Sequence, residues 1–148
     1  MMIKTAGIRI ALAALVAAAP AMASAQFAKP EDAVKYRQAA FTVMGNHMGR
    51  LSAMAKGERP FDAAAAQASA RLIDSLGQLP WEAFGAGTTS KALKAEPWGD
   101  AADFKARADR MNGETAKLVQ AAASLDTLRQ QLGATGGSCK NCHDKYRN

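Results

Sequence analysis

The sequence predicts an all-α fold, an antiparallel up-down-up-down four-helix bundle. From residue 26 onward, apolar residues recur at alternating steps of three and four, which is the period of an amphipathic helix. Breaks near Gly57 and Pro60, from Pro80 to Gly99, and near Ser124 divide this pattern into four segments. The first and last connections are short, so successive helices should lie antiparallel around one core.

The first two predicted helices each have a proline at one end. Proline and acidic residues suit a first helical turn, so the first helix should begin near Pro30 and continue to about Lys56. Its inward stripe should contain Val34, Arg37, Phe41, Met44, Met48, Leu51 and Ala55. The second helix should run from about Asp62 to Leu79. Its inward face should contain Ala65, Ala68, Leu72, Leu76 and Leu79.

The segment from Pro80 to Gly99 is predicted to be a long crossover loop held by its aromatic residues Trp81, Phe84 and Trp98. A third helix should open at Asp100 and present Phe104, Ala108, Met111, Thr115, Leu118 and Ala122 inward. The fourth should present Leu125, Leu128, Leu132, Thr135, Cys139, Cys142 and Tyr146. Gly133, Gly136 and Gly137 lie inside it, so either the helix breaks or kinks there or a bulky group lies close to its backbone.

Residues 1–25 are predicted to be an export signal that is removed. Lys4 and Arg9 give a basic start to an apolar run from Ile10 to Ala19. Ala23-Ser24-Ala25 has the small-x-small form of a cleavage site, which leaves residues 26–148 as one domain. The apolar run is too short for a mature anchor, so a soluble protein with no membrane partner is expected.

The charge balance favours anionic partners only weakly. The signal holds two of the 19 basic residues and none of the 13 acidic ones, which leaves a mature charge of about +4. No basic patch interleaved with aromatic residues accompanies it, so no nucleic-acid partner is expected.

The run Cys139-Lys140-Asn141-Cys142-His143 has the spacing of a c-type haem attachment site. On a helix the two cysteines share one face, so both sulfurs could form thioethers with the vinyl groups of one porphyrin. His143 could then be the proximal ligand of the iron. The motif and the signal together predict one covalently attached haem c per chain, in a bacterial periplasm.

Three other uses of these cysteines fit less well. A thioredoxin-like dithiol would follow a strand and begin a helix, whereas this motif ends a helical pattern. A structural zinc site needs four ligands, and the chain offers only Cys139, Cys142, His143 and His47. A disulfide between the two cysteines would close a very small loop and stabilise little.

Antiparallel packing should bring His143 to the region from Lys35 to Met44. There, Arg37 occupies a stripe position that ought to be apolar. A buried guanidinium needs an anionic partner, and the haem propionates would provide two carboxylates, with Gln38 adding a hydrogen bond. The alternative is that Arg37 reaches solvent at the helix end.

The sixth coordination position of the iron distinguishes a gas-binding haem protein from an electron carrier. Phe41 lies on the predicted stripe and cannot ligate iron, and none of the five residues after His143 is methionine or histidine. Met44, Met48 and His47 are expected to have ordinary core or surface roles, because methionine commonly fills helical cores.

The mature chain resembles cytochrome c′ over essentially its whole length. The similar segments are Gln26-Phe27-Ala28-Lys29-Pro30, Tyr36-Arg37-Gln38, His47-Met48-Gly49-Arg50, Leu79-Pro80-Trp81, Ala83-Phe84-Gly85, Trp98-Gly99-Asp100-Ala101-Ala102 and the run from Gly136 to Arg147. The attachment motif alone is unspecific among cytochromes, but its position after four amphipathic helices is much more specific.

This resemblance implies a five-coordinate, high-spin haem with His143 on one side and an apolar distal pocket on the other. It implies binding of nitric oxide and carbon monoxide, discrimination against dioxygen, and a role in protection from nitric oxide. Phe41 would crowd the vacant position, and Arg147 would be the basic residue near the proximal histidine. Such proteins are commonly homodimers joined through the first two helices, where Met54 and Ala64 would permit a contact.

Three functions are therefore considered. The first is a gas-binding, high-spin haem protein, and the second is a low-spin electron carrier with Met44 as sixth ligand. The third is an enzyme such as a peroxidase, which the lack of a distal histidine and arginine pair near Phe41 disfavours. We expect no catalytic residues and an unidentified redox partner, and we assign no haem contact to residues 88–92, where the chain departs from the family pattern.

Overall fold

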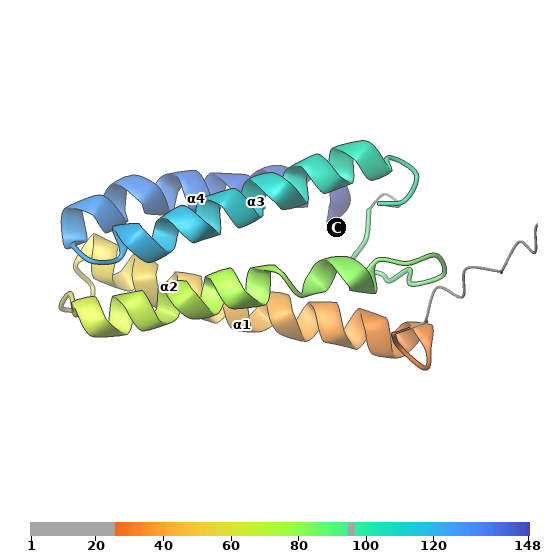
Figure 1. Cartoon of the computed structure of the whole chain (residues 1–148), viewed down its shortest axis with the longest axis horizontal. Coiled ribbons are helices and arrows are strands. Elements are labelled where there is room, and N and C mark those ends of the chain that lie inside the picture. Colours follow the sequence, from red (N-terminus) through yellow and green to blue (C-terminus); the bar gives the residue numbers. More distant parts are fainter. Residues whose placement is uncertain (1–25, 95–96) are drawn as a thin grey trace, which may run out of the picture.

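The computed structural model describes residues 26–94 and 97–148 and shows an all-α bundle. Its elements are α1 (Pro30–Lys56), α2 (Ala63–Gly77), the short 3₁₀ helix η1 (Pro80–Ala83), α3 (Ala101–Ala121) and α4 (Leu125–Tyr146). The α1/α2 pair and the α3/α4 pair form two layers, and the crossover from α2 to α3 lies at the same end of the bundle as the end of α4 (Figure 1). The four-helix prediction is confirmed. The predicted signal lies outside the described residues, within which no helix is long and apolar enough to cross a bilayer.

Local sequence signals set most helix ends. Pro30 stands in the first turn of α1, and Gly57 ends that helix at a φ of 78°, a left-handed conformation that favours glycine. Each of the other long helices follows a side chain that accepts a hydrogen bond from a backbone N–H of the first turn. These capping residues are Asp62, Asp100 and Ser124.

The apolar core is densest at the end of the bundle away from the crossover. Leu51, Leu118 and Leu128, from α1, α3 and α4, are fully buried, and Ile73 of α2 packs in the same cluster. Burying a leucine side chain contributes about 1.5–3 kcal/mol, so this cluster is a main source of stability. The predicted inward seam of α3 is confirmed by the burial of Ala108, Met111, Thr115, Leu118 and Ala122.

The predicted inward face of α2 is wrong by about one residue. Leu72 and Leu79 are 45% and 39% exposed, and Ala65 and Ala68 are exposed as well. The buried residues are Ala66, Ser69, Ala70, Ile73 and Gly77, with Leu76 partly buried against the core. Both sets have helical spacing, and in an alanine-rich helix the packing of the neighbouring helices decides which set faces inward.

α4 is continuous through Gly133, Gly136 and Gly137, so of the alternatives considered for these glycines a helix break is wrong. A Cβ added at any of the three would meet open space within 4 Å. Close approach of neighbouring protein therefore does not require glycine at these positions.

Candidate functional site

A cavity of about 740 Å³ lies at the crossover end of the bundle, between α1, α3, α4 and the loop after η1. Its size falls within the roughly 300–1,000 Å³ of pockets that bind small molecules and cofactors. The residues predicted from sequence to form the site all line it: Arg37, Gln38, Phe41, Cys139, Cys142, His143 and Arg147. Antiparallel packing thus brings His143 to the same cavity as the first turns of α1, as predicted.

The attachment motif occupies the closing turns of α4. Cys139 and Cys142 are free and partly buried, and burial raises the pKa of both thiols. The guanidinium of Arg107 opposes that rise at Cys142. Much of the His143 side chain remains accessible to solvent. Its pKa is nevertheless lowered, mainly because the surrounding protein removes water from the imidazole and also because Arg147 carries a positive charge nearby. A lowered pKa favours the neutral imidazole, which is the form that binds metal ions.

Arg37 is 3% exposed and connects α1 to the crossover loop. Its Nη1 donates to the Ala83 carbonyl at 2.7 Å and to Thr88 Oγ1 at 2.9 Å, and its Nη2 donates to the Thr88 carbonyl at 2.6 Å. The guanidinium also lies 4.4 Å from the centroid of the Phe84 ring. The alternative that Arg37 reaches solvent is therefore wrong. Within residues 26–94 and 97–148 its recorded partners are uncharged, so a carboxylate partner stays a prediction.

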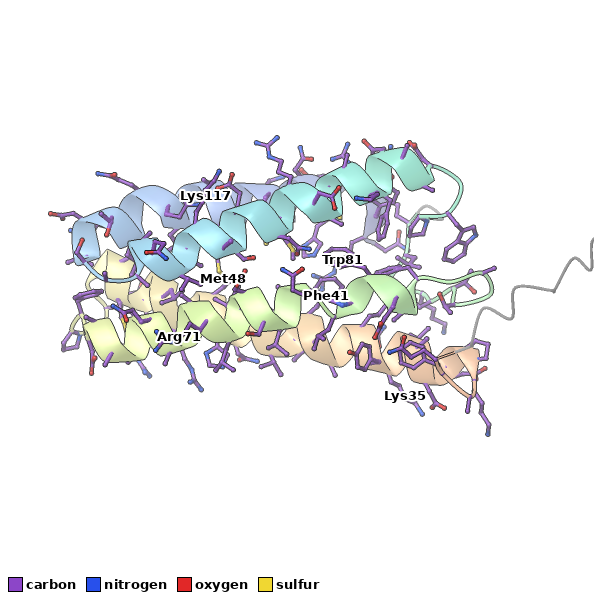
Figure 2. All side chains as sticks on the ribbon, viewed as in Figure 1. Lys35, Phe41, Met48, Arg71, Trp81 and Lys117 are labelled. Atoms are coloured by element: carbon purple, nitrogen blue, oxygen red, sulfur yellow. The ribbon has the colours of Figure 1, made fainter. Side chains whose placement is uncertain are left out.

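Phe41 and Trp81 form one wall of the cavity. Their ring centroids are 6.0 Å apart in an edge-to-face arrangement, and Figure 2 shows the two side chains close together. The Trp81 Nε1 donates to the Gly77 carbonyl at 2.7 Å, so this donor is used by α2.

Met44 and Met48 also line the cavity, and both pack against the apolar core. Met44 is 5% exposed, and its Cε lies 3.6 Å from the position that a Cβ would take at Gly77. The Cε of Met111 lies 3.2 Å from the same position. The absent side chain at Gly77 therefore makes room for two methionine methyl groups, which agrees with the core role predicted for Met44.

An aromatic cluster that the sequence did not assign to the site continues the wall. Phe104 lies 5.8 Å from Trp81, 4.8 Å from Phe84 and 5.2 Å from Tyr146 between ring centroids. The apolar stripe predicted Phe104 and Tyr146 to face inward, but one-dimensional spacing does not reveal that two helices and a loop bring these rings together.

A polar cluster connects α3 to the last turn of α4. Asp103 Oδ2 accepts hydrogen bonds from Arg107 Nε at 2.6 Å, Lys145 Nζ at 2.9 Å and the Tyr146 hydroxyl at 2.8 Å. Arg107 also donates to the Asn141 carbonyl at 2.8 Å, inside the attachment motif. The hydrogen bonds from Arg107 and Lys145 hold the pKa of Asp103 well below its usual range.

A second groove, of about 700 Å³, lies between α1 and α2. His47 belongs to this groove and not to the cavity, and its Nδ1 lies 3.2 Å from Ser69 Oγ. Met54 and the exposed Leu72 also line the groove. Ala64 is exposed on α2 but is not among the residues that line it.

Comparison with known proteins agrees with this geometry. The sequence profile described as Cytochrome C′ matches residues 32–147. Cytochrome c′ of Alcaligenes xylosoxydans xylosoxydans is 48% identical over 124 residues, which cover 82% of this chain and 98% of that protein. The crystal structure of cytochrome c′ from Rubrivivax gelatinosus superposes with a TM-score of 0.79 at 44% identity, over 83% of this chain and 100% of that chain.

Solved structures of variants of the Alcaligenes xylosoxidans protein include a carbon monoxide-bound form and a nitric oxide complex. Each is 47% identical to this chain, with a TM-score of 0.78 and coverage of 83% of this chain and 99% of that chain.

Proposed function

Because the chain belongs to the cytochrome c′ family, a family that implies covalently bound haem c, we propose that Cys139 and Cys142 attach one haem and that His143 is the axial ligand of its iron. The observation that carries this proposal is that two free thiols and an imidazole on one face of α4 line a single cavity of about 740 Å³. Bound there, the haem would supply an iron atom with one coordination position available to a diatomic gas.

The chain's own residues fit such a group. The cavity wall is largely apolar and aromatic, which suits the porphyrin plane, while Arg37 and Gln38 bring donors for its propionates. The glycine at position 136 lies on the α4 side of the wall, next to the attachment motif, so no side chain fills that part of the cavity.

We propose that the distal side is apolar and lacks a protein ligand. Phe41 lines it and cannot bind iron, and the methyl group of Met44 is directed to Gly77 in the core. The N–H of Trp81 is already donated to a carbonyl of α2. With no donor from Phe41 or from the Trp81 N–H, bound dioxygen, which carries partial negative charge, would lack stabilisation, whereas nitric oxide and carbon monoxide would lose less.

We further propose that the protein works in the periplasm in nitric oxide protection and electron transfer, and not as an enzyme. The export signal in the sequence supports the location. His47, the histidine outside the attachment motif, lines the α1/α2 groove and not the cavity, so the described residues that line the cavity include no distal histidine of the kind a peroxidase would need. The exposed Leu72 and the partly buried Met54 in that groove support a homodimer through α1 and α2.

The test is an optical spectrum of the purified protein, oxidised and reduced, with and without carbon monoxide. We expect a high-spin spectrum, ready uptake of carbon monoxide by the ferrous protein and no methionine-to-iron charge-transfer band. That band, together with poor gas uptake and its loss in Met44→Leu, would instead support the low-spin electron carrier, which the position of Met44 on the cavity wall keeps open.

A further inference from the structure

The residues that follow α4 pair with the crossover loop. α4 ends at Tyr146, and Arg147 is extended, with φ −117° and ψ 135°. Lys94 N–H donates to the Tyr146 carbonyl at 3.0 Å, and Asn148 N–H donates to the Ala92 carbonyl at 3.0 Å, which makes an antiparallel bridge between Leu93 and Arg147. We call residues 91–94 and 146–148 the C-terminal clasp.

The side chain of Asn148 supplies two further bonds of the clasp. Its Nδ2 donates to the Lys91 carbonyl at 2.9 Å and to the Leu93 carbonyl at 3.0 Å. An amide nitrogen has two hydrogens, so both donors of this side chain can be used on one loop. The side chain of one exposed residue thus donates to the carbonyls of Lys91 and Leu93, which are two residues apart in the loop.

The clasp also completes the hydrogen bonding of the α4 terminus. The last carbonyls of a helix have no partner within it, and α4 has no left-handed glycine cap, since Arg147 is extended. Instead, the His143 carbonyl accepts from Arg147 N–H at 2.9 Å, the Asp144 carbonyl accepts from Lys94 Nζ at 3.3 Å, and the Tyr146 carbonyl accepts from Lys94 N–H. The loop therefore caps the turn that carries His143.

The clasp lies against the cavity. Ala92 and Leu93 of the loop and His143 and Arg147 of α4 line the same wall. Helix ends and loops are normally the parts of a fold that open most easily. A turn that must present an imidazole in a fixed orientation at such a place needs support from outside the helix.

We propose that Asn148 is a positioning residue that, through the clasp, fixes the closing turn of α4 and holds His143 and Arg147 against the crossover loop. The proposal rests on the function proposed above insofar as His143 is the iron ligand. The clasp itself depends only on bonds between residues of this chain.

The experiment compares the full-length purified protein with Asn148→Ala, Asn148→Gln and the control Gln130→Ala, which removes an exposed amide side chain near the start of α4. Hydrogen exchange is followed by mass spectrometry in peptides that cover residues 90–94 and 143–148. Losing two hydrogen bonds, partly replaced by bonds to water, should speed exchange there about tenfold in Asn148→Ala. Asn148→Gln, which keeps both donors, should restore part of the protection, and Gln130→Ala should match the parent.

A second readout is the iron–histidine stretching band in the resonance Raman spectrum of the ferrous protein, which should broaden or shift in Asn148→Ala alone. Unchanged exchange in Asn148→Ala would overturn the clasp. Faster exchange with an unchanged band would overturn the positioning role. A colourless protein would overturn the proposed function. Hydrogen exchange in the closing turn of α4 would then be the only test of whether Asn148 stabilises the clasp.

Discussion

The two ends of the bundle are held together by different interactions. Away from the crossover, Leu51, Leu118 and Leu128 are fully buried, and the helices meet through close apolar packing. At the crossover end, the helices surround a cavity, and hydrogen bonds from Arg37 and to Asp103 connect them across its edges. Apolar packing has no directional requirement and closes space, whereas directional bonds can hold elements apart at fixed positions. The first end supplies stability and the second supplies a site.

The largest effect should come from the packed end. We expect Leu118→Ala to lower the free energy of unfolding by about 2–5 kcal/mol, because it removes a fully buried side chain and leaves a cavity. Leu79→Ala, at a leucine that is 39% exposed, is the matched control and should cost much less. Urea unfolding followed by circular dichroism measures both. Equal losses of unfolding free energy in the two variants would contradict the conclusion that the packed end supplies most of the stability.

At the cavity end, Arg37→Met should lower the free energy of unfolding by about 1–3 kcal/mol, because the buried carbonyls of Ala83 and Thr88 lose their donors. The crossover loop should also become sensitive to limited proteolysis. Arg71→Met, on the exposed side of α2, should change neither quantity. If loop cleavage were the same in the two variants, Arg37 would not hold the loop.

A smaller, pH-dependent effect is expected at Asp103. Because its folded pKa lies below the unfolded value of about 3.9, its carboxylate stabilises the fold at neutral pH, and this contribution is lost as the pH falls below about 4 toward the folded pKa. Thermal unfolding at several pH values should show Asp103→Asn below the parent at pH 7, with the difference shrinking in acid. Asp109→Asn, which breaks the exposed pair with Lys105, should show a weaker trend. A difference independent of pH would refute the ion-pair explanation.

The smallest expected change in the free energy of unfolding is an increase. Gly133→Ala places a better helix former in open space and should raise the free energy of unfolding by about 0.5–1 kcal/mol. Gly136→Ala is the sharper comparison, because position 136 lines the cavity. There we expect a lower fraction of chains that carry haem, measured by intact mass. Equal haem content in the two variants would show that position 136 does not contact the porphyrin.

Much of this arrangement could be predicted from local sequence signals. Pro30, Asp100 and Ser124 mark helix starts because capping involves neighbouring residues only. Cys139, Cys142 and His143 were assigned to one site because their spacing along a helix is fixed by the helix itself.

The features that escaped prediction depend on distant parts of the chain. Two candidate faces of α2 had the same period, and only packing against α1 and α3 selects the face that contains Ile73. The hydrogen bonds from Arg37 to the carbonyls of Ala83 and Thr88 were not predicted, because these partners lie far from Arg37 along the chain. The partners of Asn148 in the loop lie more than 50 residues away, with no sequence pattern to indicate them.

The crossover loop is fastened from two sides, by Arg37 of α1 near its beginning and by Asn148 further along. All of these bonds are made by the polypeptide itself, so the conformational entropy of ordering the loop is lost when the chain folds. A haem attached to Cys139 and Cys142 would therefore lie against a preorganised wall, and the cost of ordering that wall would not oppose its incorporation.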